Sequence, residues 1–110
     1  MAQVLDFNKV KKTYLTITLN DEKKTKLLVM TPTKKLLTEL SAMLPDNSDE
    51  VPDEEDLNAL FELAARLMSR NKAGVHVTGD QLAEILDFED LIIFFNAYTE
   101  FVSAAASEKN

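Results

Sequence analysis

Residues 14–30, with the sequence YLTITLNDEKKTKLLVM, decide how the chain begins to fold. Apolar and polar side chains alternate over residues 14–19, as a half-buried strand requires, and the polar run 20–24 is typical of a turn. A second β-favouring run follows the turn. The apolar side chains expected on the buried face are Leu15, Ile17, Leu19, Leu27 and Val29. The pattern predicts an antiparallel hairpin over about residues 13–30.

Helices are expected to cover this hairpin, because an isolated two-stranded sheet is marginally stable in water. Further along the chain, apolar residues recur at intervals of three and four, and each such stretch follows a residue that can cap a helix. The candidate caps are Thr33, Asp53, Thr78 with Gln81 as its capping-box partner, and Asp87. The sequence therefore predicts an α+β fold, a hairpin followed by helices near residues 33–44, 54–71, 79–86 and 88–106.

The first and last predicted helices carry the clearest packing signals. In the first helix one apolar stripe is expected to lie over the hairpin, and it consists of Leu36, Leu37, Leu40, Met43 and Leu44. The last helix holds five of the eight aromatic residues, namely Phe88, Phe94, Phe95, Tyr98 and Phe101. We therefore expect the last helix to be the centre of the core.

The apolar surface of the last helix is wider than the one stripe that a single neighbour can cover. The residues that widen it are Phe88, Ile92, Ile93, Phe94 and Phe101. Either other helices surround it, or part of it binds another protein. Aromatic anchors dominate protein interfaces, so the aromatic cluster is the candidate partner-binding surface. The candidate residues are Phe94, Tyr98, Phe101 and Val102, with Phe94 and Phe101 expected to be exposed.

The length of 110 residues fits a single domain, spanning residues 1–110. Residues 45–53 are expected to form an acidic linker between the first helix and a helical body over about 54–106. A calcium loop beginning at Asp46 is excluded, because Val51 stands where the sharp-turn Gly belongs and Leu57 where the bidentate Glu belongs. The acidic stretch is interpreted as solvated chain.

The charge is acidic overall and unevenly distributed. The net charge of −7 opposes attraction to nucleic-acid phosphates. Residues 1–40 hold eight basic and four acidic side chains, whereas residues 41–110 hold four basic and fifteen acidic ones. Copies of the chain can therefore associate, with the basic hairpin region of one against the acidic linker or helix of another. The alternative is that the two regions are separate solvated faces.

Catalytic chemistry is not expected. The chain has no Cys, one His and two Gly, so it offers no thiolate zinc site, no phosphate-binding glycine loop and no recognisable catalytic triad. His76 lies between two valines before a predicted helix cap, and it is interpreted as a structural or surface residue, with a pH-sensitive contact as the alternative. We expect a protein that is not an enzyme and that binds neither cofactor nor metal.

No segment of the sequence favours secretion or membrane insertion. The first residues lack a basic region followed by an apolar run, and the longest strongly apolar stretch, residues 91–95, is far too short to cross a bilayer. The absence of Cys is compatible with a reducing compartment. We therefore expect a cytoplasmic protein without a membrane partner.

Two parts of the sequence resemble a known family. These are KVKKTYLTITLND at residues 9–21, followed by LLVMTP at 27–32, and LDFEDLIIFFNAY at 86–98. Together with the order of basic hairpin, acidic linker and aromatic-rich helices, they make the chain similar to the tail assembly chaperones of long-tailed phages and prophages of Gram-positive bacteria. The resemblance covers most of the chain.

The resemblance implies a non-enzymatic role in the cytoplasm of a bacterial host. Proteins of this family bind the tape measure protein, prevent its aggregation and help to bring tail tube subunits to it. An acidic helical domain with a wide apolar face suits binding to amphipathic helices. The alternatives are an acidic DNA mimic that inhibits a nucleic-acid-binding enzyme, supported by the carboxylates after residue 40, and a small structural tail or connector protein.

Overall fold

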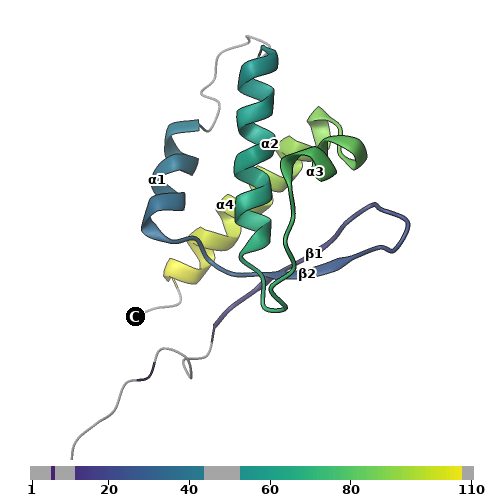
Figure 1. The fold of residues 1–110 in the computed structure, drawn as a ribbon. Helices are drawn as coiled ribbons and strands as arrows, with labels where there is room; N and C mark the ends of the chain where they lie inside the picture. Colours follow the sequence, from purple (N-terminus) through teal and green to yellow (C-terminus); the bar gives the residue numbers. More distant parts are fainter. Residues whose placement is uncertain (1–5, 7–11, 44–52, 108–110) are drawn as a thin grey trace, which may run out of the picture.

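The computed structural model describes Asp6 and residues 12–43 and 53–107 of the chain. The predicted α+β architecture is confirmed: an N-terminal antiparallel hairpin is followed by four helices (Figure 1). The elements in chain order are β1 (Leu15–Thr18), β2 (Lys26–Val29), α1 (Lys34–Met43), α2 (Glu54–Ser69), α3 (Gly79–Ile85) and α4 (Phe88–Ser107). The acidic linker predicted at 45–53 lies outside the described residues except for Asp53.

The hairpin has the register that the alternation predicts. Leu15 is opposite Val29 and Ile17 is opposite Leu27, so these four apolar side chains face the helices. Leu27 and Val29 are fully buried, whereas Thr16 and Thr18 face solvent. The hairpin therefore supplies one side of the core.

The turn between the strands is closed by Asp21. Its carboxylate accepts hydrogen bonds from the backbone N–H of Thr25 at 2.9 Å and from the Thr25 hydroxyl at 2.7 Å. Lys24 adopts a positive φ of 49°, which completes the reversal of the chain. The predicted turn residues thus form the turn by their own hydrogen bonds.

The predicted helix caps are present in the structure. Asp53 accepts a hydrogen bond from the backbone N–H of Asp56 at 2.8 Å, and Thr78 and Gln81 form a reciprocal capping box. Asp87 and Asp90 form the same reciprocal arrangement at the start of α4, with distances of 2.8 and 3.1 Å. These local hydrogen bonds explain why the helix starts follow from the sequence.

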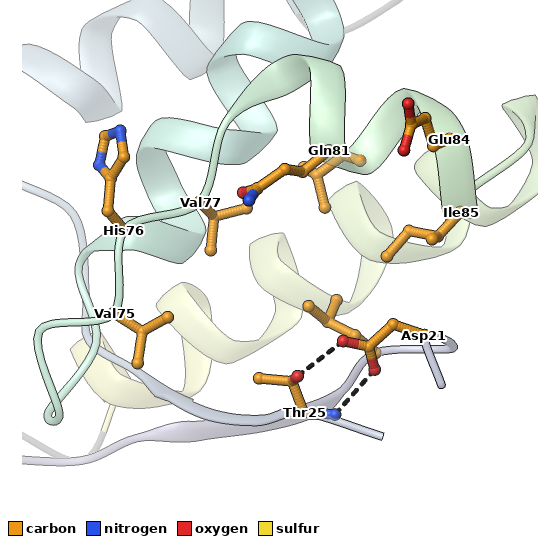
Figure 2. Close-up of a pocket in the computed structure, with 10 residues that line it drawn as sticks. Asp21, Thr25, Val75, His76, Val77, Gln81, Glu84 and Ile85 are labelled. Atoms are coloured by element: carbon orange, nitrogen blue, oxygen red, sulfur yellow. Dashed lines mark hydrogen bonds between the residues drawn. The ribbon is translucent and has the colours of Figure 1, made fainter. Parts of the chain in front are cut away.

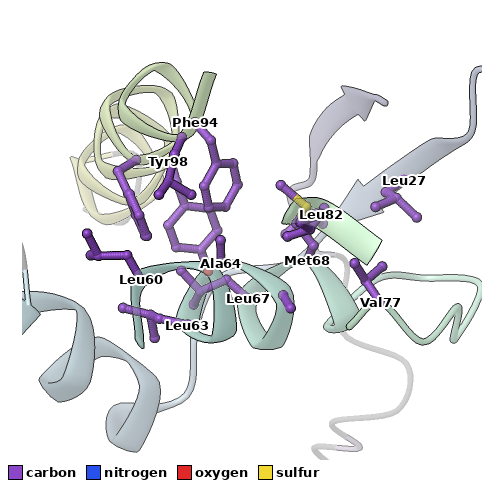
Figure 3. Close-up of a cluster of buried hydrophobic side chains, with 14 of the residues drawn as sticks. Leu27, Leu60, Leu63, Ala64, Leu67, Met68, Val77, Leu82, Phe94 and Tyr98 are labelled. Atoms are coloured by element: carbon purple, nitrogen blue, oxygen red, sulfur yellow. The ribbon is translucent and has the colours of Figure 1, made fainter. Parts of the chain in front are cut away.

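The centre of the core is α2 rather than the last helix, which corrects the prediction. α2 contacts α1, α3, α4 and β2 and lies among them (Figure 1). Six of its residues are buried: Leu60, Leu63, Ala64, Ala65, Leu67 and Met68. Phe94 and Tyr98 point from α4 toward this helix (Figure 3).

The first helix packs against α2 and does not lie over the hairpin as predicted. Leu40 is buried in that contact, but Leu37 is 41% exposed. Arg66 of α2 forms an ion pair with Glu39 of α1 at 3.0 Å, which joins the same two helices at the surface. The hairpin is contacted instead by α2, through β2.

Candidate protein-binding groove

The central strand of the sheet region is β2, because both of its edges are paired. One edge pairs with β1, and the other meets the segment that follows α2. Met30 donates its backbone N–H to the carbonyl of Arg70 at 2.8 Å, and Lys72 donates to the carbonyl of Leu28 at 2.9 Å. The segment after α2 therefore acts as a short third strand on one side of β2.

The outer edge of β1 is unpaired in the part of the chain that the structure describes. Leu19 donates its backbone N–H to the Thr25 carbonyl at 2.8 Å, and in an antiparallel ladder such bonded pairs alternate with non-bonded ones. Leu15 and Ile17 accordingly bond to β2, whereas the backbone groups of Thr16 and Thr18 point away from it. Two N–H donors and two carbonyl acceptors thus point away from β2 along this edge.

An open groove of about 320 Å³ separates β1 from α4. One side is formed by residues 15–20 of the hairpin, and the other by the end of α3 and the first half of α4. The residues on the helical side are Leu86, Asp90, Ile93, Phe94 and Ala97, with Met68 of α2 between the two sides. Most of these side chains are apolar, so the groove can bind an apolar surface.

One hydrogen bond ties the two sides of the groove together. The Asn20 amide donates to the carbonyl of Ile85 at 2.7 Å, which ties the end of β1 to α3. The Asp90 carboxylate, which lines the groove, accepts a hydrogen bond from the backbone N–H of Asp87, the residue that caps α4. The groove is therefore part of the folded architecture.

The predicted partner-binding residues occupy different environments. Phe94 is 7% exposed and Tyr98 is fully buried, so the expectation that Phe94 lies at the surface is wrong. Their rings form a continuous series with Phe95 and Phe101, in which neighbouring centroids are 5.3 to 6.0 Å apart. Phe101 and Val102 are partly buried against the core. Partner binding by these four residues stays a prediction, with Phe101 and Val102 the accessible pair.

The exposed large apolar residues of α4 within the described chain are Ile93, at 63% exposure, and Phe88, at 42%. Sequence reasoning counted both as apolar surface of this helix but did not choose them as binding residues. The helical repeat could have indicated Ile93. Ile93, Ala97 and Phe101 are spaced four residues apart, so they lie on one face of the helix. Only the packing on α2 shows which face of α4 is turned away from the core.

Tyr98 connects α4 to the end of the hairpin. Its hydroxyl donates a hydrogen bond to the carbonyl of Met30 at 3.1 Å, although the ring is fully buried. Burial raises the pKa of the Tyr98 phenol well above its ordinary value, and the nearby Arg70 charge opposes the shift only partly. The hydroxyl is therefore protonated at physiological pH and acts as a structural donor.

A second hollow of about 270 Å³ lies between the hairpin turn and α3. Figure 2 shows Asp21 and Thr25 on one side of it and Gln81, Glu84 and Ile85 on the other. The hydrogen bonds from the hydroxyl and then the backbone of Thr25 lower the pKa of Asp21. His76 lines the hollow, but its ring points away from the Asp21 carboxylate (Figure 2).

This second hollow provides no recognisable catalytic arrangement. The Asp21 carboxylate is engaged with Thr25, and His76 is exposed. Among the described residues no group of three His, Asp or Glu side chains is placed to hold a metal ion. The groove beside β1 is the better candidate for a binding site.

The segment 70–77 contains the buried polar residue that sequence reasoning missed. Asn71 is 4% exposed, and its amide donates to the carbonyls of Met68 and Val75 at 2.9 and 2.7 Å. Its side-chain oxygen accepts from the Val75 backbone N–H at 2.8 Å. Asn71 thus orders the turn that places the short third strand against β2.

None of the helices in the described ranges has the length and apolar character needed to cross a bilayer. A search of protein-family models gave no match to the chain, and neither curated proteins nor solved structures matched it.

Proposed function

We propose that the protein is a non-enzymatic tail assembly chaperone of a long-tailed phage or prophage, acting in the cytoplasm of a Gram-positive host. In this role it binds the tape measure protein and assists assembly of the tail tube protein around it. The resemblance of residues 9–32 and 86–98 to that family supports the class of function. The structural observation that supports a protein-binding role is the open apolar groove between β1 and α4.

The groove suits an amphipathic helix, which is the form of client that the resemblance implies. Helices of this kind bind by placing a stripe of apolar side chains in a hydrophobic groove. Ile93 projects into solvent beside the groove, and Ala97 provides a small side chain one turn later. Phe101 follows at the same helical interval, so it would extend the apolar contact along α4.

The direct test is co-purification with the tape measure protein after expression of both proteins. Ile93→Ser is expected to reduce recovery of the client about tenfold, since loss of an apolar anchor removes most of its contact. Phe101→Ser should reduce it as well. Leu37→Ser is the matched control, because Leu37 is an exposed apolar residue on α1 that does not line the groove.

The possible results of this experiment test the proposed function and the proposed binding site separately. Client binding by the wild type that Ile93→Ser does not weaken would show that another surface binds the client. A wild-type protein that does not bind the tape measure protein would contradict the proposed function. Binding to a nucleic-acid-processing enzyme that duplex DNA competes away would favour the DNA-mimic alternative.

A further inference from the structure

We infer that the groove between β1 and α4 selects an amphipathic helix whose apolar stripe is flanked by Lys and Arg side chains. The inference rests on the proposed function, which provides a helical client, and it adds the chemical class of that client. It follows from the charges that surround the groove.

The helical side of the groove carries carboxylates and no cation. The stretch from the start of α3 to the end of α4, residues 79–107, contains no Lys or Arg. Its six carboxylates are Asp80, Glu84, Asp87, Glu89, Asp90 and Glu100. A client helix placed against this side therefore meets formal charges of one sign.

Three of these carboxylates border the exposed apolar face of α4. Asp90 lines the groove itself. Glu89 lies one turn before Ile93, and Glu100 follows Ala97 by three residues, so both share a helix face with these two apolar residues. Both Glu side chains are exposed. The apolar contact that Ile93 and Ala97 offer thus has a carboxylate at each end.

No Lys or Arg neutralises these three carboxylates within the described ranges. The ion pair found there joins Arg66 to Glu39, and it lies between α1 and α2. Asp90 accepts a hydrogen bond from the backbone N–H of Asp87, but a neutral donor leaves the negative charge in place. The three carboxylates can therefore pair with cations that a client brings.

The hairpin side of the groove does not reverse this charge. Residues 15–20, which line that side, include no charged side chain. Lys26 is opposite Thr18 and shares its solvent face, on the other side of the sheet from the helices. The outward backbone groups of β1 are donors and acceptors in equal number, so they favour neither sign. The sign of the preferred client is set by α4.

A helix with basic flanks matches both features of the site. Its apolar stripe covers Ile93 and Ala97, and the side chains beside the stripe reach the carboxylates of α4. Lys and Arg have long apolar stems and carry only hydrogen-bond donors, so they can extend along the apolar face to an acceptor. A helix flanked by Glu would place like charges against each other. The charges therefore discriminate between helices, while the apolar contact provides most of the affinity.

The first experiment measures binding of two synthetic peptides of about 20 residues to the full chain by fluorescence anisotropy. The peptides share one helical stripe of Leu and differ only in whether Lys and Arg or Glu flank the stripe. At low salt the basic peptide should bind at least about tenfold more tightly. The difference should shrink toward about 1 M salt, where the Debye length is about 3 Å. A scrambled basic peptide without an apolar stripe is the control and should bind weakly.

The second experiment locates the charge effect. The double variant Glu89→Gln with Glu100→Gln should bind the basic peptide about three- to tenfold more weakly than the wild type. The matched control is Glu54→Gln with Glu55→Gln, which removes the same charge from exposed positions on α2 that do not line the groove. This control should bind nearly as the wild type does. Ile93→Ser should weaken binding about tenfold, as expected for a peptide in the groove.

Three results would overturn the inference. The first is equal binding of the basic and acidic peptides at low salt, or equal binding of the scrambled peptide. The second is an equal loss of binding in the two double variants, which would attribute the preference to the net charge of the protein. The third is self-association that Ile93→Ser abolishes, since a second copy would then be the occupant of the groove.

Failure of this inference and failure of the proposed function give different results. Binding of the tape measure protein without any preference between the peptides would overturn the client class and leave the function intact. Binding of the basic peptide in the groove without binding of the tape measure protein would support the client class and contradict the function.

Discussion

The hydroxyl of Tyr98 donates a hydrogen bond of 3.1 Å to the backbone carbonyl of Met30, across 68 positions of sequence. The bond joins the middle of α4 to the residue that leaves β2. It therefore couples the helix that forms one side of the groove to the hairpin that forms the other.

Removal of this hydroxyl should destabilise the protein without changing its surface. Tyr98→Phe leaves the Met30 carbonyl without its partner, and we expect a loss of about 1 to 3 kcal/mol in the free energy of unfolding. Urea denaturation followed by circular dichroism measures it. Thr99→Val is a useful control, because Thr99 bonds only within its own helix. Equal stability of Tyr98→Phe and the wild type would show that the bond makes no net contribution.

Neighbouring residues in α4 should respond very differently to truncation. Phe94→Ala removes a buried ring and should cost about 3 to 5 kcal/mol. Ile93→Ala, at a position that is 63% exposed, should change the stability by no more than about 0.5 kcal/mol. Thermal or urea unfolding of the two variants tests the orientation of the helix. A reversed order would mean that α4 is rotated relative to α2.

Asn71→Ala should be among the most destabilising polar substitutions. It leaves the Val75 N–H and two carbonyls without the side-chain partner that they now have, so a loss of about 2 to 3 kcal/mol is expected. Asn96→Ala, at an exposed position in α4, is the control and should be nearly neutral. Hydrogen exchange at Met30 and Lys72 should also accelerate in Asn71→Ala, because their bonds depend on the same turn.

Asp21 should contribute to the acid sensitivity of the fold. Its pKa in the folded state is lowered from the ordinary value of 3.8 by the Thr25 hydroxyl and backbone. A lowered folded-state pKa means that the stabilisation is present above pH 3.8 and is lost as the pH falls through the folded-state pKa. Asp21→Asn should therefore lower the melting temperature at neutral pH more than at acid pH, once the native carboxyl has become protonated below its lowered pKa. An equal decrease at both pH values would contradict this assignment.

The sequence by itself determined the elements with local causes. The alternation around Ile17 predicted the hairpin, and Asp53, Thr78 and Asp87 predicted the starts of three helices. Caps and turns involve residues three or four apart in the chain, so the chemistry of a short segment is sufficient to specify them. The α+β class followed from the order of these elements.

The tertiary structure decided which apolar faces are buried. Ile93 and Phe94 are adjacent and both strongly apolar, yet one is exposed and the other lies in the core, because the position of α2 sets the rotation of α4. The same packing turns Leu37 outward and brings Asn71 to the edge of β2. These outcomes depend on contacts between residues far apart in the sequence, where periodicity gives the width of an apolar face but not its neighbour. The outer edge of β1, which is unpaired within the described ranges, and the groove beside it are properties of that arrangement.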